Sequence, residues 1–422
     1  MKTIITSYLA LVAILFGAIV MVHFIPKQWI NTNVQSSVEI FRKEGLYPNI
    51  LNFKLFQLDN YSDAMMMNMA ISADSSHPVR SAMLNNWHTS GRYFDMAEDA
   101  DKVAKNHLES LKAQPYGRYW NGYQIFLRPL LCLFNYREIR LLNYLLLSSL
   151  LITISWLMIT KVGKSATMLF LASLACINFP IVPLSIHFSA VFYITFISIA
   201  FILLERGFIL KHQLFNGLFF IIGGLTSSLD LLTAPLITLG IPLLVYIIYL
   251  NPIHKIRTVI LGSGVWFLGY TSIWVTKWGL GTLLTGVNLM QDASDAAAVR
   301  LSKRIFTGME VTIPNMLEFA YTYLQQRHLF WPLIILLLIV LASLVGAVKN
   351  WQKVKENSYL LLISLMVPVW YLVVRNHSVQ HGWFTWRATV VSVFAGLLFM
   401  SRAMSFERYH SLFKRVIPSV NK

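Results

Sequence analysis

Two carboxylates four residues apart, Asp59 and Asp63, are the first side chains in this chain that could do chemistry. If the segment from Asp59 onward is helical, both lie on the same side of the helix. A carboxylate at a membrane surface can remove a proton from a sugar hydroxyl, or it can hold a divalent cation such as Mg²⁺ or Mn²⁺. The alternative is that Asp63 only caps the methionine-rich helix that follows.

A second group mixes aromatic and polar side chains between residues 117 and 123. The rings of Tyr119, Trp120 and Tyr123 suit the faces of carbohydrate rings, and Arg118 suits a lipid phosphate. The alternative is an aromatic belt with an arginine that reaches the membrane interface. Composition alone favours the belt.

Asp230 lies between two apolar runs, close to a predicted membrane edge. A charge in that position is costly and normally faces a cavity or a partner. Asp230 also suits a helix cap, because Thr233 and Pro235 suit the start of the next helix. We expect Asp230 to bind substrate and shape a cavity rather than to carry out the chemistry.

Positive or protonatable side chains stand at the ends of several apolar runs, beside tryptophans. Arginine forks and lysine charges near the membrane plane suit phosphate recognition. The spacing of two histidines by four residues resembles a metal pair, but no third ligand accompanies them, so zinc is not expected. We expect a donor-phosphate site with a neighbouring substrate contact, built from Arg375, His377, Arg387, Lys277 and His381.

The elements that must position these groups are membrane helices. With 56% apolar residues and 13% charged residues, the composition indicates an all-α polytopic membrane protein. The net charge of +16 does not indicate a nucleic-acid partner, because the basic residues cluster in short loops between apolar runs. About ten runs approach the ~20 residues that a membrane span needs. They cover residues 4–25, 139–160, 166–184, 188–205, 213–229, 232–250, 257–276, 329–348, 357–374 and 383–402.

The distribution of charge predicts the orientation. Alternate connections hold 15 basic residues against three acids, so the positive-inside rule places them and both termini in the cytoplasm. The other side carries a first loop at 26–138, a second at 278–328 and a short loop at 375–382. The first of these holds 11 of the 19 acids. An apolar run at 125–134 is too short to span and predicts an interfacial helix. We expect one membrane domain over residues 1–422.

The segments 60–68, 117–123, 227–235 and 376–387 carry a resemblance to bacterial integral-membrane glycosyltransferases of the GT-C type. The resemblance covers the layout of the whole chain. It implies that a sugar is moved from a polyprenyl-phosphate carrier to a cell-surface glycan or a lipid-linked acceptor, on the outer face of the plasma membrane. It assigns the role of base or metal ligand to Asp63 first and Asp59 second. The chain departs from the family in one respect, because GT-C acids often lie close after the first span as adjacent acids or Asp-x-Asp.

Two other functions remain open. A polysaccharide polymerase or ligase that uses a diphosphate-linked lipid also has outer arginines, but its large polar loop usually comes later in the chain. A flippase for lipid-linked glycans would carry charges along the bilayer midplane and inverted repeats. Few charges lie within the predicted spans, and we see no repeat.

Overall fold

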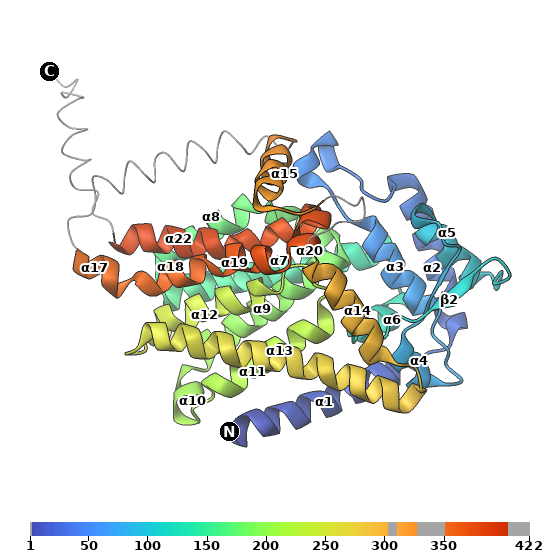
Figure 1. Ribbon diagram of the computed structural model, residues 1–422, viewed down its shortest axis with the longest axis horizontal. Helices are drawn as coiled ribbons and strands as arrows, with labels where there is room; N and C mark the ends of the chain where they lie inside the picture. Colours follow the sequence, from blue (N-terminus) through green and yellow to red (C-terminus); the bar gives the residue numbers. More distant parts are fainter. Residues whose placement is uncertain (1, 303–309, 327–350, 404–422) are drawn as a thin grey trace.

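The structure, a computed structural model, describes residues 2–302, 310–326 and 351–403. The described residues are mainly helical, as predicted, with one short two-stranded ribbon that the sequence analysis did not foresee (Figure 1). The predicted span 329–348 lies outside the described residues. So do Lys349 and the basic residues beyond 403.

The polar segment after the first span holds five helices, three short 3₁₀ turns and the ribbon. The elements up to residue 131 are α1 (Lys2–His23), α2 (Lys27–Glu44), η1 (Ile50–Asn52), η2 (Lys54–Phe56), α3 (Asn60–Ile71), α4 (Pro78–Leu84), β1 (Trp87–Thr89), η3 (Tyr93–Asp95), α5 (Met96–Ala104), β2 (Lys112–Gln114) and α6 (Gln124–Leu131). The two strands are antiparallel, with Trp87 opposite Gln114.

The rest of the described chain is helical. Its elements are α7 (Tyr136–Lys161), α8 (Lys164–Cys176), η4 (Phe179–Leu184), α9 (Ile186–Leu204), α10 (Arg206–Lys211), α11 (Phe215–Leu229), α12 (Leu236–Leu250), α13 (Lys255–Thr285), α14 (Leu289–Leu301), α15 (Ile313–Gln326), α17 (Trp351–Glu356), α18 (Ser358–Ser364), α19 (Met366–Val373), α20 (Arg375–Gln380), α21 (Gly382–Thr385), η5 (Trp386–Ala388) and α22 (Thr389–Ala403).

Five helical segments in the described residues are long and apolar enough to cross a membrane. They are α1, α7, α9, α13 and the continuous stretch from α21 through α22. Four other predicted spans fall on shorter apolar helices: α8, α11, α12 and the pair α18–α19. The sequence therefore predicted about ten spans, whereas only five segments of the described residues are long enough to cross a membrane.

The two ends of the helical bundle differ in what they carry. Figure 1 shows the N-terminus, α10 and α17 at one end, and α2 to α6 with the ribbon at the other. The short basic connections are therefore separated from the acid-rich segment by the length of the apolar helices. We call the end that carries α2 to α6 the polar end.

The polar segment has a hydrophobic core of its own, in which α2 contributes Ile30 and Val34 and α3 contributes Met66 and Met67. The predicted interfacial run appears as α6, which buries Leu127, Leu131 and Arg128. The opposite side of α6 leaves Phe126 61% exposed. One buried face and one exposed apolar face suit a helix that lies at a membrane surface.

Close backbone contact holds α11 against α13. A side chain added at Gly223 would come within 2.0 Å of the Trp266 carbonyl oxygen, and one added at Gly269 within 2.1 Å of the Phe220 oxygen. Only glycine fits at both positions, because a Cβ atom would force the helices apart. The contact therefore fixes the orientation of α13, and with it the positions of Trp266 and Tyr270.

Two buried cations tie the polar segment to the long apolar helices α1 and α13. Arg128 donates to the carbonyl oxygens of Val22 at 2.9 Å and Ile25 at 2.6 Å, at the end of α1, and also to Ala70 near the end of α3. Lys277 donates to Ala82 and Met83 at 2.9 and 3.0 Å, at the end of α4. Carbonyl groups at helix C-termini carry partial negative charge, so they stabilise a cation that has no acidic partner.

Candidate functional site

Asp59 lies just outside helix α3 and caps it. Its backbone (φ −124°, ψ 73°) is not helical, and its carboxylate accepts hydrogen bonds from the Ser62 amide at 3.0 Å and the Ser62 hydroxyl at 2.8 Å. The indole of Trp383 donates a third at 3.3 Å. The capping role that the sequence offered as an alternative for Asp63 is thus performed by Asp59.

Asp63 lies in the first turn of α3 and faces the start of α9. Its carboxylate accepts hydrogen bonds from Tyr136 at 2.5 Å, from the Ser185 hydroxyl at 3.0 Å, and from the amides of Ile186 and His187 at 3.1 and 2.8 Å. A negative charge at this place stabilises the N-terminus of α9. The first-loop carboxylate that was expected to face substrate is therefore fully buried and surrounded by donors.

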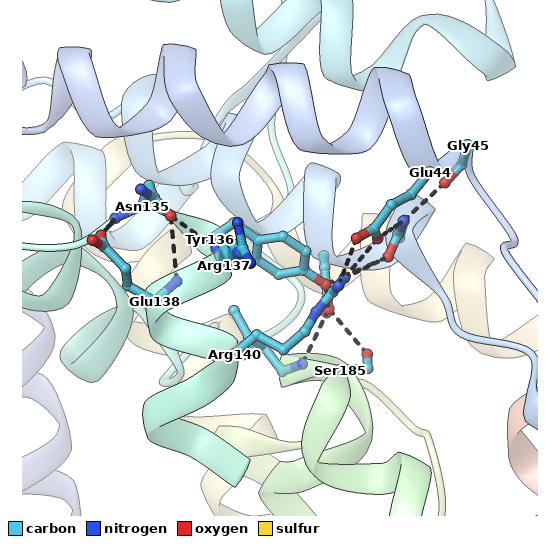
Figure 2. Close-up of polar contacts among 11 residues, drawn as sticks. Glu44, Gly45, Asn135, Tyr136, Arg137, Glu138, Arg140 and Ser185 are labelled. Atoms are coloured by element: carbon cyan, nitrogen blue, oxygen red, sulfur yellow. Dashed lines mark hydrogen bonds and ion pairs between the residues drawn. The ribbon is translucent and has the colours of Figure 1, made fainter. Parts of the chain in front are cut away.

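A chain of polar contacts continues from Asp63 through Tyr136. Figure 2 shows its outer part, where Tyr136, Arg140 and Glu44 lie close together. The guanidinium group of Arg140 lies 4.4 Å from the ring centre of Tyr136, and it pairs with Glu44 at 2.8 and 3.0 Å. Asn60 donates to the same carboxylate at 3.0 Å. These contacts fix α7 against α2 and α3. The network therefore holds helices together.

The acid pair does not fit a metal ion. Three donors already engage Asp59, and four engage Asp63, which leaves little free coordination capacity on either carboxylate. Within the described ranges, no group of three or more His, Cys, Asp or Glu side chains could hold a metal ion.

A layer of histidines lies next to this network. His187, whose backbone N–H donates a hydrogen bond to the Asp63 carboxylate, has its ring 3.3 Å from the Thr233 hydroxyl. His377 contacts the Leu232 carbonyl oxygen at 2.9 Å through Nε2, and its ring centre is 4.7 Å from that of His381. Burial holds the pKa of His377 well below its ordinary value and lowers that of His381 to about 4, so both rings are neutral at pH 7.

Asp230 stands in the turn between α11 and α12, where its carboxylate accepts the Thr233 amide at 3.0 and 3.1 Å. The predicted helix cap is therefore wrong, because α12 begins at Leu236 after Pro235 and Asp230 bonds an amide of the preceding turn. Gly122 also holds this turn, because its amide donates to the Ser228 carbonyl oxygen at 2.8 Å. A side chain at Gly122 would collide with that oxygen, so only glycine allows the contact. Burial raises the pKa of the Asp230 carboxyl to about 7. A carboxyl group with that pKa can exchange a proton near neutral pH.

Arg300, on α14, completes the cluster. It donates to the Tyr119 hydroxyl at 2.8 Å and acts electrostatically on His377 and His381. Asp230 and Arg300 also act on the hydroxyl group of Tyr270, on α13. Segments far apart in the chain therefore meet in one polar layer at the polar end, and we call Asp230, Arg300, Tyr119, Tyr270, His187, His377 and His381 the polar cluster.

Several polar atoms in this region have no hydrogen-bond partner within the described chain. They are buried and belong to Tyr270 (Oη), Trp274 (Nε1), Arg300 (Nε), His377 (Nδ1) and His381 (Nδ1). A buried polar group without a partner costs about 1–3 kcal/mol. Four of these side chains belong to the polar cluster and Trp274 lies beside Tyr119, so each of these atoms has a free position for a bond to a polar ligand.

Three predicted phosphate ligands are engaged by other groups of the protein. Lys277 is fully buried and holds the end of α4, so it cannot meet a lipid phosphate at a span end. Arg118 pairs with Asp292 at 3.2 Å and lies over the ring of Tyr116 at 4.2 Å. Arg375 donates to the Leu372 carbonyl oxygen at 3.0 Å on the exposed side of α20.

Other predicted residues are buried close to the polar cluster. Arg387 donates to the Trp383 carbonyl oxygen at 3.1 Å, lies 3.9 Å from the ring centre of Phe188, and acts electrostatically on Asp59. Trp120 donates to Ile273 at 2.8 Å, and the Tyr123 hydroxyl lies 3.0 Å from the sulfur of Met69. Trp120 packs against α1 and α13, whereas Tyr123 lies in the core of the polar segment; both are buried and present no face to a sugar.

The sequence analysis missed Arg300, Tyr270 and Trp274. A signal for two of them was present, since Trp266, Tyr270, Trp274 and Trp278 recur every four residues along one predicted helix. Nothing in the sequence marked Arg300 among the other basic residues.

Neither the family models nor the curated proteins nor the solved structures that were compared with this chain give a match.

Proposed function

We propose that this protein is an integral-membrane glycosyltransferase of the GT-C type, which moves a sugar from a polyprenyl-phosphate carrier to a glycan or lipid-linked acceptor. The supporting observation is the polar cluster itself. A carboxyl group with a pKa of about 7, an arginine and two neutral imidazoles lie together at the ends of membrane helices. Sugar transfer from a lipid phosphate needs these groups: a base for the acceptor and donors for the leaving phosphate.

Asp230 is the base in this proposal. Its carboxylate takes the proton from an acceptor hydroxyl while the acceptor oxygen bonds to the anomeric carbon of the donor sugar. The bond between that carbon and the phosphate oxygen breaks, and polyprenyl phosphate leaves with the bonding electrons. Asp63, expected from the sequence to be the base, instead positions His187 through the start of α9.

The leaving phosphate is met by Arg300 and by the unpartnered Nδ1 of His381. The neutral ring of His377 carries its proton on Nε2, which donates to the Leu232 carbonyl oxygen, so His377 holds the site in place and gives no hydrogen bond to the phosphate. Arginine supplies a fixed positive charge, and a neutral imidazole can donate a hydrogen bond from Nδ1. Arg387 contacts the ring of Phe188 and acts electrostatically on Asp59, so it adds positive potential to the site. No step requires a divalent cation.

The polar end faces the outside of a bacterial plasma membrane in this proposal, and both termini are cytoplasmic. The short basic connections at the opposite end support this orientation through the positive-inside rule. A carrier lipid and the enzyme then share one membrane, which supplies proximity between donor and site.

Mass spectrometry of co-purified lipid tests the proposal. The full chain is purified in mild detergent, and bound lipids are extracted and identified. We expect a polyprenyl phosphate that carries one sugar, and we expect Arg300→Gln to lose most of it. Arg137→Gln, an exposed arginine at the start of α7, is the matched control and should retain it.

Other lipids would contradict the proposal. A diphosphate-linked glycan would favour the polymerase or ligase alternative. Ordinary glycerophospholipids alone, in equal amounts in wild type and Arg300→Gln, would remove the carrier site from the polar cluster.

A further inference from the structure

A row of four aromatic side chains follows one face of α13. Trp266, Tyr270, Trp274 and Trp278 are each four residues apart, and successive ring centres are 4.9, 4.8 and 6.0 Å apart. The outer part, from Tyr270 to Trp278, is about 12 Å long at 1.5 Å per residue. A helix that only faced lipid would not need rings in contact along one line.

The row is fixed at both ends. The indole of Trp266 donates to the Thr238 hydroxyl at 3.2 Å, and that of Trp278 donates to the Arg118 carbonyl oxygen at 2.8 Å. Between them, Tyr119 meets the ring of Trp274 edge-on at 6.0 Å. Rings held in this way lose little conformational entropy when a ligand stacks on them.

The row becomes more open toward the polar end. Trp266 and Tyr270 are buried, whereas Trp274 and Trp278 are half-buried. Asp230 acts electrostatically on Tyr270, the last buried ring before Trp274. A ligand that lay along the half-buried rings would reach Asp230 with one end.

Two polar atoms of the row have no partner within the part of the chain that the structure describes. They are the hydroxyl of Tyr270, a side chain that is 3% exposed, and the indole nitrogen of Trp274. An isoprenoid chain would stack on the rings but would leave both atoms unpaired, at a cost in free energy. A sugar ring offers an apolar face to the aromatic rings and hydroxyl groups to these two atoms.

We propose that Tyr270, Trp274 and Trp278, with Tyr119 at their side, form a saccharide-binding surface that takes the acceptor glycan and delivers its hydroxyl to Asp230. This inference rests on the proposed function, because it names the acceptor side of the same site. Stacking on the open rings holds the sugar, and the Tyr270 and Trp274 donors select its hydroxyl pattern.

A glycan array tests the surface without a transfer reaction. Full-length protein in fluorescent nanodiscs is applied to an array of bacterial and synthetic glycans. Wild type should bind at least one class of glycan. Trp274→Ala should weaken that binding about tenfold, the loss expected for one aromatic contact. Trp274→Phe should retain part of it, and Tyr270→Phe, which lacks only the hydroxyl, should alter which glycans bind.

Trp156→Ala is the matched control, because Trp156 is a tryptophan on α7 with 61% exposure. It should bind as wild type does. Gel filtration and thermal unfolding confirm that each variant is folded before it is applied.

The outcomes separate the two proposals. No glycan binding by folded wild type, or equal binding by wild type and Trp274→Ala, overturns the saccharide surface, even if the co-purified lipid is a polyprenyl-phosphate sugar. Glycan binding that depends on Trp274, together with ordinary glycerophospholipids in the lipid extract, supports the surface and overturns the proposed transfer.

Discussion

The hydroxyl group of Tyr136 donates a 2.5 Å hydrogen bond to the carboxylate of Asp63, and this contact joins the start of α7 to α3. Asp63 in turn holds the first amides of α9. One buried acid therefore fixes the relative positions of three helices that meet at the polar end. His187 supplies one of these amides, so the position of its ring depends on the same carboxylate.

Tyr136→Phe should lower the free energy of unfolding by about 2 kcal/mol, because a hydrogen bond to a charged group is lost while the ring remains. The ring should stay in place, since it packs on Phe41 with centres 4.4 Å apart. Thermal or denaturant unfolding in detergent measures the change. Tyr144→Phe on the same helix, where the side chain is 37% exposed, is the control. Equal stabilities of the two variants would mean that the bond to Asp63 contributes nothing.

The role of the acid pair could not be read from its spacing. Residues four apart share a face only when both are helical, and Asp59 is one residue outside α3. Which of the two acids caps depends on where the helix starts, and helix starts are uncertain by one or two residues. The donors to Asp63 come from 73 to 124 positions away, and no local pattern predicts such contacts.

Lys277→Met should destabilise the protein by about 1–3 kcal/mol, because the Ala82 and Met83 carbonyl oxygens lose their donor in a buried place. The affinity for a polyprenyl-phosphate sugar should stay the same in molecules that remain folded. Unfolding and lipid binding are measured side by side, with the exposed Lys161→Met as control. Unchanged stability with weakened lipid binding would return Lys277 to the phosphate site that the sequence suggested.

Apolar patterning predicted where the apolar helices of the described chain lie, but only five of these segments are long enough to cross a membrane. It could not predict what the rare charges do. Lys277 stands at a predicted span end, where a phosphate contact is reasonable, but its partners lie almost 200 residues away, at the C-terminus of α4. No sequence pattern distinguished Arg300 from the other arginines of the predicted loops, and only the fold shows that it contacts Tyr119.

Single cysteines at positions 353 and 109 should be labelled from opposite sides of the membrane. The native Cys132 and Cys176 are first replaced, and Lys353→Cys and Glu109→Cys are then made; both original side chains are exposed. An impermeant thiol reagent added to intact cells should label position 109 and reach position 353 only after lysis. Labelling of position 353 in intact cells would reverse the orientation and move the polar cluster to the cytoplasmic side.

Sugar transfer should depend on pH through Asp230. A base must be ionised, so kcat/KM should rise about tenfold per pH unit on the acid side and level off above a pKa of about 7. Release of polyprenyl phosphate between pH 5 and 9 measures this. Asp230→Asn should be at least ~10²-fold slower and should lack this limb. The exposed Asp295→Asn on α14 is the control and should behave as wild type does.

The free energy of unfolding should fall as pH rises, whereas the rate of sugar transfer should rise. The carboxyl of Asp230 binds its proton more tightly in the folded chain, with a pKa of about 7, than in the unfolded chain, where the ordinary value is 3.8. Between these values the folded state holds more protons, so the Asp230 contribution to the free energy of unfolding falls as pH rises from about 4 to about 7. Asp230→Asn cannot ionise and should lose this slope, while its side-chain oxygen still accepts the Thr233 amide. If wild type and Asp230→Asn show the same slope, Asp230 ionises as it does in water; if they also transfer sugar equally, Asp230 is not the base.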